Sequence, residues 1–290
     1  MLIATCNVNG IRAAVRKGIQ EWITTTAPDV LLLQEVRAPE ELVPSLVGEN
    51  YRVYQQACDI KGRAGVAVAV RNEYAVSRVS IGLGADLPES DPGADARTFW
   101  DRPAEPGVDT GRWVEVDIPQ LGTTFVSAYL HSGTATDEAK MAAKYSHLDR
   151  VSTRLVQLQQ NRPADVPHVL VTGDFNIVHT ELDITNWRSN HNKTSGVLDP
   201  EIAYLDKWMN EFGYVDVQRS LIGDEQAEYT WWSQRGKAFD NNVGWRIDYH
   251  VASPQLASAA QSVRIDRAPS YDQRWSDHAP LLVEYEVNNA

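Results

Sequence analysis

Cysteine is scarce in this chain of 290 residues. Cys6 and Cys58 stand far apart, which excludes a disulfide framework and the paired spacing of a cysteine zinc site. No apolar run approaches the roughly 18 residues that cross a membrane. The first residues read as a strand and lack the pattern of a secretion signal. We therefore expect a protein of a reducing, cytoplasmic compartment, with no membrane partner and in the simplest case a monomer.

Basic residues are also in short supply. The 27 Lys and Arg residues against 39 Asp and Glu residues give a net charge of −12, which argues against a broad electrostatic grip on a polyanion. Part of the excess acid lies between Asp86 and Asp109, a stretch that also holds several prolines. We interpret this stretch as a long solvated loop.

Apolar, β-branched runs alternate with helical patterns along the chain. Leu2–Cys6 and Asp29–Glu35, with a helix between them, predict a crossover unit. Further strands are expected at 51–54, 65–70, 113–118, 123–130, 169–173, 245–251 and 279–287, and a helix at about 137–158. No repeat or linker divides the chain, and 43% hydrophobic residues suffice for a full core. We therefore expect one α/β domain over residues 1–290.

The stretch from Val169 to Ile177 carries the clearest chemical signal. Its apolar part predicts a buried strand, which ends at Gly173 and then presents Asp174 and Asn176. In an extended chain, residues two apart point to the same face, so a carboxylate and a carboxamide would project together. Such a pair can accept a proton from water and donate a hydrogen bond to an oxyanion. A strand followed by an ordinary Asp/Asn turn has the same pattern.

Polar residues stand at the ends of other predicted strands as well. They are Asn7, Glu35, Tyr129, Asp248 and His278, with Asp277 beside the last. Each one has an ordinary explanation as a cap, a surface group or a turn, and their convergence is a hypothesis. If they meet, their oxygen ligands favour Mg²⁺ over zinc. A histidine paired with a carboxylate also suits proton transfer near neutral pH.

Six short blocks, in this order, resemble the exonuclease III family of apurinic/apyrimidinic endonucleases, part of the endonuclease/exonuclease/phosphatase superfamily. They are NVNGIR (7–12), LQE (33–35), KGRAGVA (61–67), GDFNI (173–177), WRIDY (245–249) and SDHAP (276–280). The resemblance runs nearly from end to end. It implies a four-layer α/β sandwich in which helices flank two mixed β-sheets.

The resemblance also implies roles for single residues. Asp174 would activate the attacking water and Asn176 would stabilise the transition state. Tyr129 would contact the phosphate, as would His278, which Asp248 orients. Mg²⁺, with Mn²⁺ as an expected substitute, would be held by metal ligands, namely Glu35, Asn7 and Asp277. The residues expected to contact DNA are Arg112, Lys193, Trp231, Trp232, Trp245 and Arg246.

The activity implied is Mg²⁺-dependent hydrolysis of the phosphodiester 5′ to abasic sites. It would include 3′–5′ exonuclease and 3′-phosphatase or phosphodiesterase action on double-stranded DNA with abasic sites or blocked 3′ ends. One alternative is hydrolysis of a lipid or sugar phosphate, and a second is an idle binding module. The intact polar set argues against the second. The tryptophans favour DNA over a small ester, although Trp231 and Trp232 could equally belong to the core. His131 is a departure, since family members often carry proline there.

Overall fold

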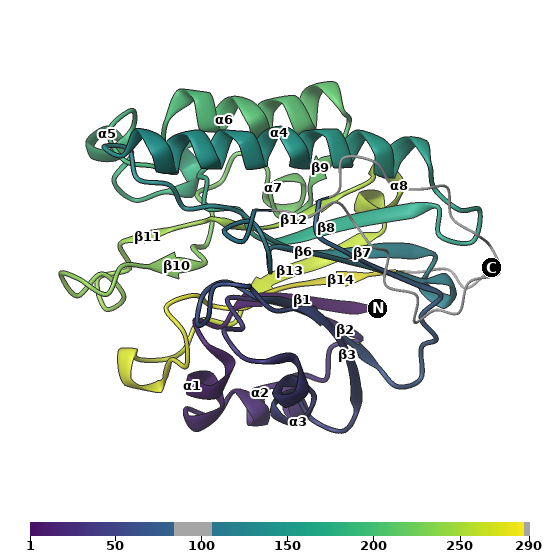
Figure 1. Cartoon of the computed structure of the whole chain (residues 1–290). Coiled ribbons are helices and arrows are strands. Elements are labelled where there is room, and N and C mark those ends of the chain that lie inside the picture. Colours follow the sequence, from purple (N-terminus) through teal and green to yellow (C-terminus); the bar gives the residue numbers. More distant parts are fainter. Residues whose placement is uncertain (84–105, 287–290) are drawn as a thin grey trace.

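Two stacked β-sheets form the centre of the computed structural model, which describes residues 1–83 and 106–286 (Figure 1). The strands of the first sheet are β1 (Leu2–Asn7), β2 (Val30–Gln34), β3 (Tyr51–Gln56), β4 (Val66–Arg71), β13 (Ala260–Ile265) and β14 (Leu281–Tyr285). Those of the second are β5 (Arg78–Ile81), β6 (Trp113–Ile118), β7 (Thr123–Tyr129), β8 (His168–Asp174), β9 (Val215–Asp216) and β12 (Asp248–Ala252). A separate small ribbon consists of β10 (Trp231–Trp232) and β11 (Gly244–Trp245).

Each large sheet has a parallel strand pair in its interior. The first sheet has the order β13-β14-β1-β2-β4-β3, and β1 runs parallel to β2. The second has the order β5-β6-β7-β8-β12-β9, and β7 runs parallel to β8. The other strand pairs of the described chain are antiparallel. Both sheets are therefore mixed, as expected.

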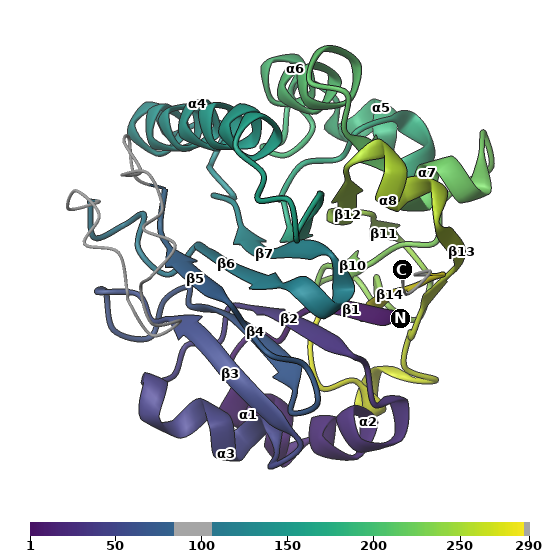
Figure 2. The ribbon, with the colours of Figure 1, turned by 90° about the vertical axis from the view of Figure 1, so that its right-hand side faces the viewer.

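Helices cover the outer faces of both sheets (Figures 1 and 2). On the first sheet lie α1 (Ile11–Arg16), α2 (Ile19–Thr26) and α3 (Val43–Val47). On the side of the second sheet lie α4 (Glu138–Gln160), α5 (Trp187–Asn190), α6 (Asp199–Asp206) and α8 (Pro254–Ser258), whereas α7 (Val217–Ile222) contacts both β12 of the second sheet and β13 of the first. Single 3₁₀ turns occur at Glu40–Leu42, Pro119–Leu121, Glu181–Asp183 and Tyr271–Gln273, and a π turn at Lys207–Glu211. Among the described residues, no helix combines the length and apolarity that a membrane crossing requires.

Alternate residues of the central strands enter different core layers. Ile3 and Phe125 belong to the apolar cluster between the sheets, whereas Ala4 packs towards α1–α3. A third cluster joins the second sheet to α4 through residues such as Leu148. Strands buried on both faces read as continuous apolar runs, which is why the sequence predicted them well. The four-layer α/β sandwich is confirmed, and the single domain over residues 1–290 stays a prediction.

Two expectations about local structure need correction. The strand expected at 245–251 is divided, because β11 ends at Trp245 and β12 begins at Asp248. The acidic stretch that we interpreted as a solvated loop lies outside the described residues from Asp86 to residue 105. Its last acid, Asp109, is only 6% exposed and ion-pairs with Arg150 at 2.6 Å. Asp109 is therefore a buried partner of other side chains and not part of a solvated surface.

Candidate active site

Three of the expected residues lie side by side at the ends of adjacent strands in the interior of the second sheet. Asp174, the last residue of β8, is paired in register with Tyr129 of β7 on one side and Asp248 of β12 on the other. Gly173 makes this close approach possible. Its φ is +141°, and a Cβ there would lie 2.0 Å from the carbonyl oxygen of Ala128, so only glycine fits. The pairing of neighbouring strand ends thus fixes the three side chains in one row.

Asp174 is held by residues from both sheets. Asn7, at the end of β1, donates from Nδ2 to Oδ2 of Asp174 at 2.9 Å. The backbone N–H of Asn176 donates to Oδ1, also at 2.9 Å. Asn176 adopts a left-handed conformation with φ of +52°, and its Nδ2 donates to the carbonyl oxygen of Leu130 at 2.9 Å. Asp174, almost fully buried, and Asn176 therefore both line the cavity, but Asn176 lies beyond β8 in a left-handed conformation and not in the extended chain that the spacing predicted.

Glu35 meets this group from the end of β2. Its Oε1 accepts hydrogen bonds from the Tyr129 hydroxyl at 2.7 Å and from Asn7 Nδ2 at 3.1 Å. Its other oxygen pairs with Arg37. Asn7 thus bridges Glu35 and Asp174 through its N–H groups, while its Oδ1 accepts from the backbone N–H of Asn9 at 2.9 Å. Asn7 as a metal ligand stays a prediction, and the contact that it makes here orients the two carboxylates.

His278 completes the group from the segment before β14. Its Nδ1 pairs with Asp248 Oδ2 at 2.8 Å, and its Nε2 lies 3.7 Å from Asp174 Oδ2. Asp277, the next residue towards the N-terminus, accepts a hydrogen bond from Asn9 Nδ2 at 2.8 Å. We call Asp174, Asp248 and His278 the cavity cluster. Their ligand atoms lie within 4.8 Å of one another, close enough to hold a metal ion.

Two members of this cluster, Asp174 and His278, have pKa values shifted upward. Burial raises the pKa of Asp174 to about 7, with the charge of Asp248 adding to the effect and that of His278 opposing it. Burial alone would lower the pKa of His278, but the charges of Asp248 and Asp174 raise it to about 10. His278 is therefore cationic at neutral pH, and Asp174 is poised to exchange a proton there. Perturbed pairs of this kind are typical of functional sites.

A cavity of about 640 Å³ opens in front of these residues. Its lining includes Glu35, Tyr129, Asp174, Asn176, Asp277 and His278. Three of the residues expected to contact DNA also line it, namely Lys193, Trp231 and Trp245. The rings of Trp231 and Trp245 meet edge to face, with centroids 5.4 Å apart. One wall of the cavity is thus aromatic.

The other residues expected to contact DNA lie away from the cavity lining. Arg246 is fully buried, and its guanidinium pairs with Asp183 at 2.8 Å and Asp216 at 2.7 Å. Trp232 is 1% exposed and packs on Phe239. The expectation of DNA contact is therefore wrong for these two, since a buried side chain cannot meet a phosphate. Arg112 is nearly buried, with its guanidinium stacked on the Tyr129 ring at 4.8 Å.

Sequence reasoning missed a buried ion pair behind the site. Lys144 Nζ pairs with Glu201 at 2.6 Å, and both side chains are fully buried. The same ammonium donates to the carbonyl oxygen of Asn176 at 3.0 Å and so supports its left-handed backbone. A signal was available, because Lys144 occupies the apolar stripe of α4 between Met141 and Leu148. A lysine in a core stripe requires a buried partner.

Comparison with known proteins agrees with this geometry. A family model described as the Endonuclease/Exonuclease/phosphatase family matches residues 4–278. An exodeoxyribonuclease of Bacillus subtilis is 28% identical over 97% of this chain and 98% of its own length. A DNA-(apurinic or apyrimidinic site) endonuclease of Dictyostelium discoideum is 26% identical over 99% of this chain and 71% of its own. The solved structure of an AP endonuclease from Archaeoglobus fulgidus superposes with a TM-score of 0.76 at 26% identity, covering 99% of this chain and 100% of that one.

Proposed function

The chain belongs to the Endonuclease/Exonuclease/phosphatase family, and we propose that it is a DNA repair nuclease that hydrolyses the phosphodiester 5′ to abasic sites. The observation that carries this proposal is the convergence of acid, amide, phenol and imidazole groups on one cavity with an aromatic wall. The printed names of the relatives, exodeoxyribonuclease and abasic-site endonuclease, support the same chemistry. Trimming of blocked 3′ ends, as 3′–5′ exonuclease and 3′-phosphatase, belongs to the proposal because it breaks the same kind of bond.

The proposed reaction begins at Asp174. Its carboxylate accepts a proton from a water molecule, whose oxygen attacks the phosphorus while the bond to the 3′ oxygen breaks. Asn176 and cationic His278 line the same cavity and donate hydrogen bonds to the phosphate oxygens as negative charge develops. Tyr129 lines it too, and its hydroxyl, which donates to Glu35 in the structure, would turn to the phosphate. Asp248 holds His278 through Nδ1 and so leaves Nε2 to face the phosphate. Asn7 donates hydrogen bonds to both Asp174 and Glu35 and so orients the two carboxylates relative to each other.

The site also suits a hard divalent cation, for which we propose Mg²⁺, with Mn²⁺ as a substitute. Glu35, Asp174 and Asp277 line the cavity together with Arg37, Lys193 and His278, and burial together with the charge of Asp248 raises the pKa of Asp174. A bound cation would favour the ionised form of such a carboxylate. Glu35 and Asp277 offer the oxygen ligands that would hold it. The ion would supply charge neutralisation at the phosphate.

The aromatic wall supports abasic DNA as the substrate. An abasic nucleotide has no base to stack, so its extrusion from a duplex costs less than the flipping of an intact nucleotide. Trp231 and Trp245 are half-buried and face the cavity, where they could pack against a bare sugar. Lys193 lies on the same lining, and its ammonium would bind a backbone phosphate.

The test offers the purified protein an abasic duplex, a matched intact duplex and a panel of lipid and sugar phosphates, each with Mg²⁺ and with chelator. We expect incision of the abasic duplex that chelator abolishes and that Asp174→Asn lacks. Turnover of the small esters alone would reject the DNA substrate and favour the other branch of the family. Incision by Asp174→Asn at the wild-type rate would reject Asp174 as the group that activates the water.

A further inference from the structure

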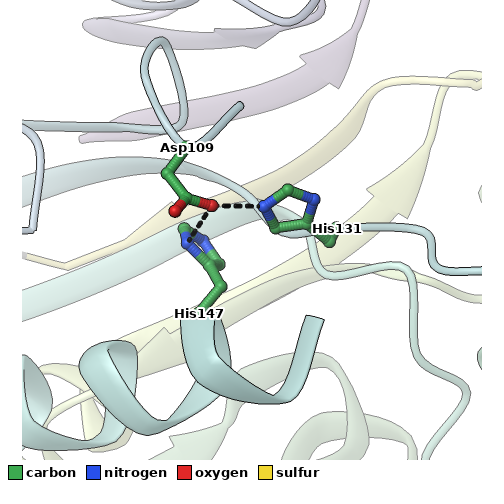
Figure 3. A group of neighbouring side chains, drawn as sticks. All are labelled: Asp109, His131 and His147. Carbon is green, nitrogen blue, oxygen red and sulfur yellow. Dashed lines mark hydrogen bonds and ion pairs between the residues drawn. The ribbon is translucent and has the colours of Figure 1, made fainter. Parts of the chain in front are cut away.

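A second group of side chains that could hold a metal ion consists of Asp109, His131 and His147 (Figure 3). Asp109 comes from the segment before β6, His131 from the segment after β7, and His147 from α4. His131 Nε2 lies 2.6 Å from Asp109 Oδ1, and His147 Nδ1 lies 3.7 Å from the same oxygen. All three side chains are buried, and their ligand atoms lie within 4.8 Å of one another. We call this group the two-histidine cluster.

His147 is the feature that ordinary packing leaves unexplained. The residue is fully buried, and neither of its ring nitrogens has a hydrogen-bond partner among the described residues. Buried polar groups almost always have a hydrogen-bond partner, because a group without one loses its hydrogen bonds to water on folding and gains none in their place. Figure 3 shows its ring directed at the carboxylate of Asp109, so that Nδ1 faces the same point as His131.

The protonation states of the cluster are those of metal ligands. Burial would raise the pKa of Asp109, but the hydrogen bond with His131 and the charge of Arg150 lower it to about 2. Burial lowers the pKa of His131 and lowers that of His147 well below 6.5. At neutral pH the group therefore consists of one carboxylate and two neutral imidazoles, the forms that bind metal.

We propose that Asp109, His131 and His147 form a second metal site, for Zn²⁺ or a similar transition-metal dication. Two imidazoles and one carboxylate are a recurrent ligand set for such ions, whereas Mg²⁺ prefers oxygen ligands alone. Bond lengths of about 2.0–2.2 Å put tetrahedral ligand atoms about 3.3 Å apart. The His147–Asp109 distance nearly fits this, and the His131–Asp109 contact would have to open by less than an ångström.

Neighbouring charges act in both directions at this site. Arg150 binds Asp109 Oδ2 at 2.6 Å, which leaves Oδ1 for the metal and fixes the carboxylate in the way that outer partners of metal ligands do. The same guanidinium and that of Arg112 lower the pKa of His131 and repel a cation. We therefore expect binding weaker than at a zinc site without neighbouring cations.

The bound ion would connect the site to the cavity. It would tie the segment before β6 to α4 and to the end of β7. Arg112 lies in that segment, donates to the carbonyl oxygen of Val108 at 2.9 Å, and stacks on Tyr129. The metal would thus hold in place Arg112, which stacks on Tyr129, without contacting the substrate.

The experiment measures zinc binding by the full chain after removal of metal. Wild type, His147→Phe and Asp248→Asn are titrated with Zn²⁺ against a chromophoric chelator, and their melting is followed with and without Zn²⁺. Asp248→Asn is the matched control, because it alters the cavity cluster and leaves the two-histidine cluster intact. We expect wild type and Asp248→Asn each to bind one equivalent of Zn²⁺ at the two-histidine cluster and to melt at a higher temperature with Zn²⁺ than without it. His147→Phe should lack both this equivalent and this gain in thermal stability.

Equal zinc equivalents and equal melting shifts in wild type and folded His147→Phe would overturn the proposal, as would a wild type that binds no zinc. If His147→Phe does not fold, His131→Asn takes its place. X-ray absorption of wild type loaded with one equivalent of Zn²⁺ needs no variant. A zinc ion coordinated by two imidazoles would support the proposed site. A zinc ion coordinated by one imidazole or none would lie in the cavity and would reject the proposed site.

Discussion

The cavity cluster and the two-histidine cluster are built from the same two residue types, yet their protonation is opposite. In the cavity cluster the pKa of Asp174 rises to about 7 and that of His278 to about 10. In the two-histidine cluster the pKa of Asp109 falls to about 2 and that of His147 falls well below 6.5. Burial acts in both places, so burial alone does not account for the difference.

The neighbouring charges decide the direction. In the cavity cluster, the charge of Asp248 favours protonation of both Asp174 and His278. In the two-histidine cluster, the charge of Arg150 favours ionisation of Asp109, and those of Arg112 and Arg150 favour the neutral form of His131. Proton transfer is therefore possible in the cavity cluster at neutral pH, and ligand binding is the chemistry open to the other. The contrast can be tested at each end.

The largest effect is expected from Asp174→Asn. A neutral amide cannot accept the proton of the attacking water, so the rate of abasic-site incision should fall by several orders of magnitude. Single-turnover kinetics on an abasic duplex, with Mg²⁺ present, measure the loss. Near wild-type turnover would mean that another group is the base.

The same variant should melt at a higher temperature than wild type at pH 8 in chelator. The pKa of Asp174 is raised from 3.8 to about 7 in the folded state, so ionisation of this carboxylate favours the unfolded state as pH rises between these values. Asn176→Ala, which keeps the buried carboxylate, serves as the control and should show no such gain. An unchanged melting temperature in Asp174→Asn would remove the basis for the contrast between the clusters.

Glu35→Gln should raise the Mg²⁺ concentration needed for half-maximal activity while it leaves zinc binding at the two-histidine cluster unchanged. One anionic ligand is lost, but the hydrogen bonds from Tyr129 and Asn7 can persist on the amide oxygen. Activity measured across a Mg²⁺ series decides this. A titration curve that coincides with that of wild type would exclude Glu35 as a ligand.

Trp245→Ala should relax the preference for abasic over intact nucleotides, with most 3′-phosphatase activity retained. Its ring lines the cavity and meets Trp231, so truncation opens the pocket that excludes a base. Cleavage of matched abasic and intact duplexes gives the selectivity, and melting gives the stability. A ring in the ordinary core would instead cost about 3–5 kcal/mol on truncation. Collapse of the fold, or unchanged selectivity in a folded variant, would reject the pocket role.

The sequence predicted the elements that depend on local pattern. The strands ending at Asn7, Tyr129 and Asp174 were expected within one residue, because runs buried on both faces are continuous and apolar. Strand β13 was missed, since its side chains are largely exposed and carry no apolar run. Convergence of the polar strand ends depended on family resemblance, because spacing along the chain does not reveal which strands are neighbours.

The contacts that sequence reasoning got wrong depend on distant partners. Arg246 was expected to contact DNA, but in the structure it is buried and pairs with Asp183 and Asp216, which come from two other segments of the chain. Asp109 looked solvated within its acidic stretch, although His131 and Arg150 enclose it. Neither pairing has a signal in spacing, since ion pairs between separate elements are set by the fold.

The smallest effect concerns acid stability, measured in chelator so that no metal masks it. The unfolded chain protonates His147 near pH 6.5, whereas the folded state resists protonation until far lower pH. The contribution of His147 to the free energy of unfolding should therefore decline as pH falls below 6.5, by up to about 1.4 kcal/mol per pH unit. Asp174 contributes in the opposite direction between pH 7 and 3.8, and it does so equally in wild type and in His147→Phe. Asp109, with its pKa lowered from 3.8 to about 2, adds a loss only below pH 3.8. Between pH 6 and about 4, His147→Phe should therefore lose less stability than wild type. Part of the acid loss should persist in the variant, because burial also lowers the pKa of His250, to about 3.

His278→Asn is the matched control from the cavity cluster. The pKa of His278 is raised from 6.5 to about 10, so its contribution is complete below pH 6.5 and is lost as pH rises towards 10. This variant should change the alkaline limb of the stability curve and leave the acid limb as in wild type. Urea unfolding at a series of pH values measures both limbs. If the free energies of unfolding of His147→Phe and wild type change in parallel below pH 6.5, the pKa of His147 is not lowered in the folded protein. The two clusters would then not differ in protonation as proposed.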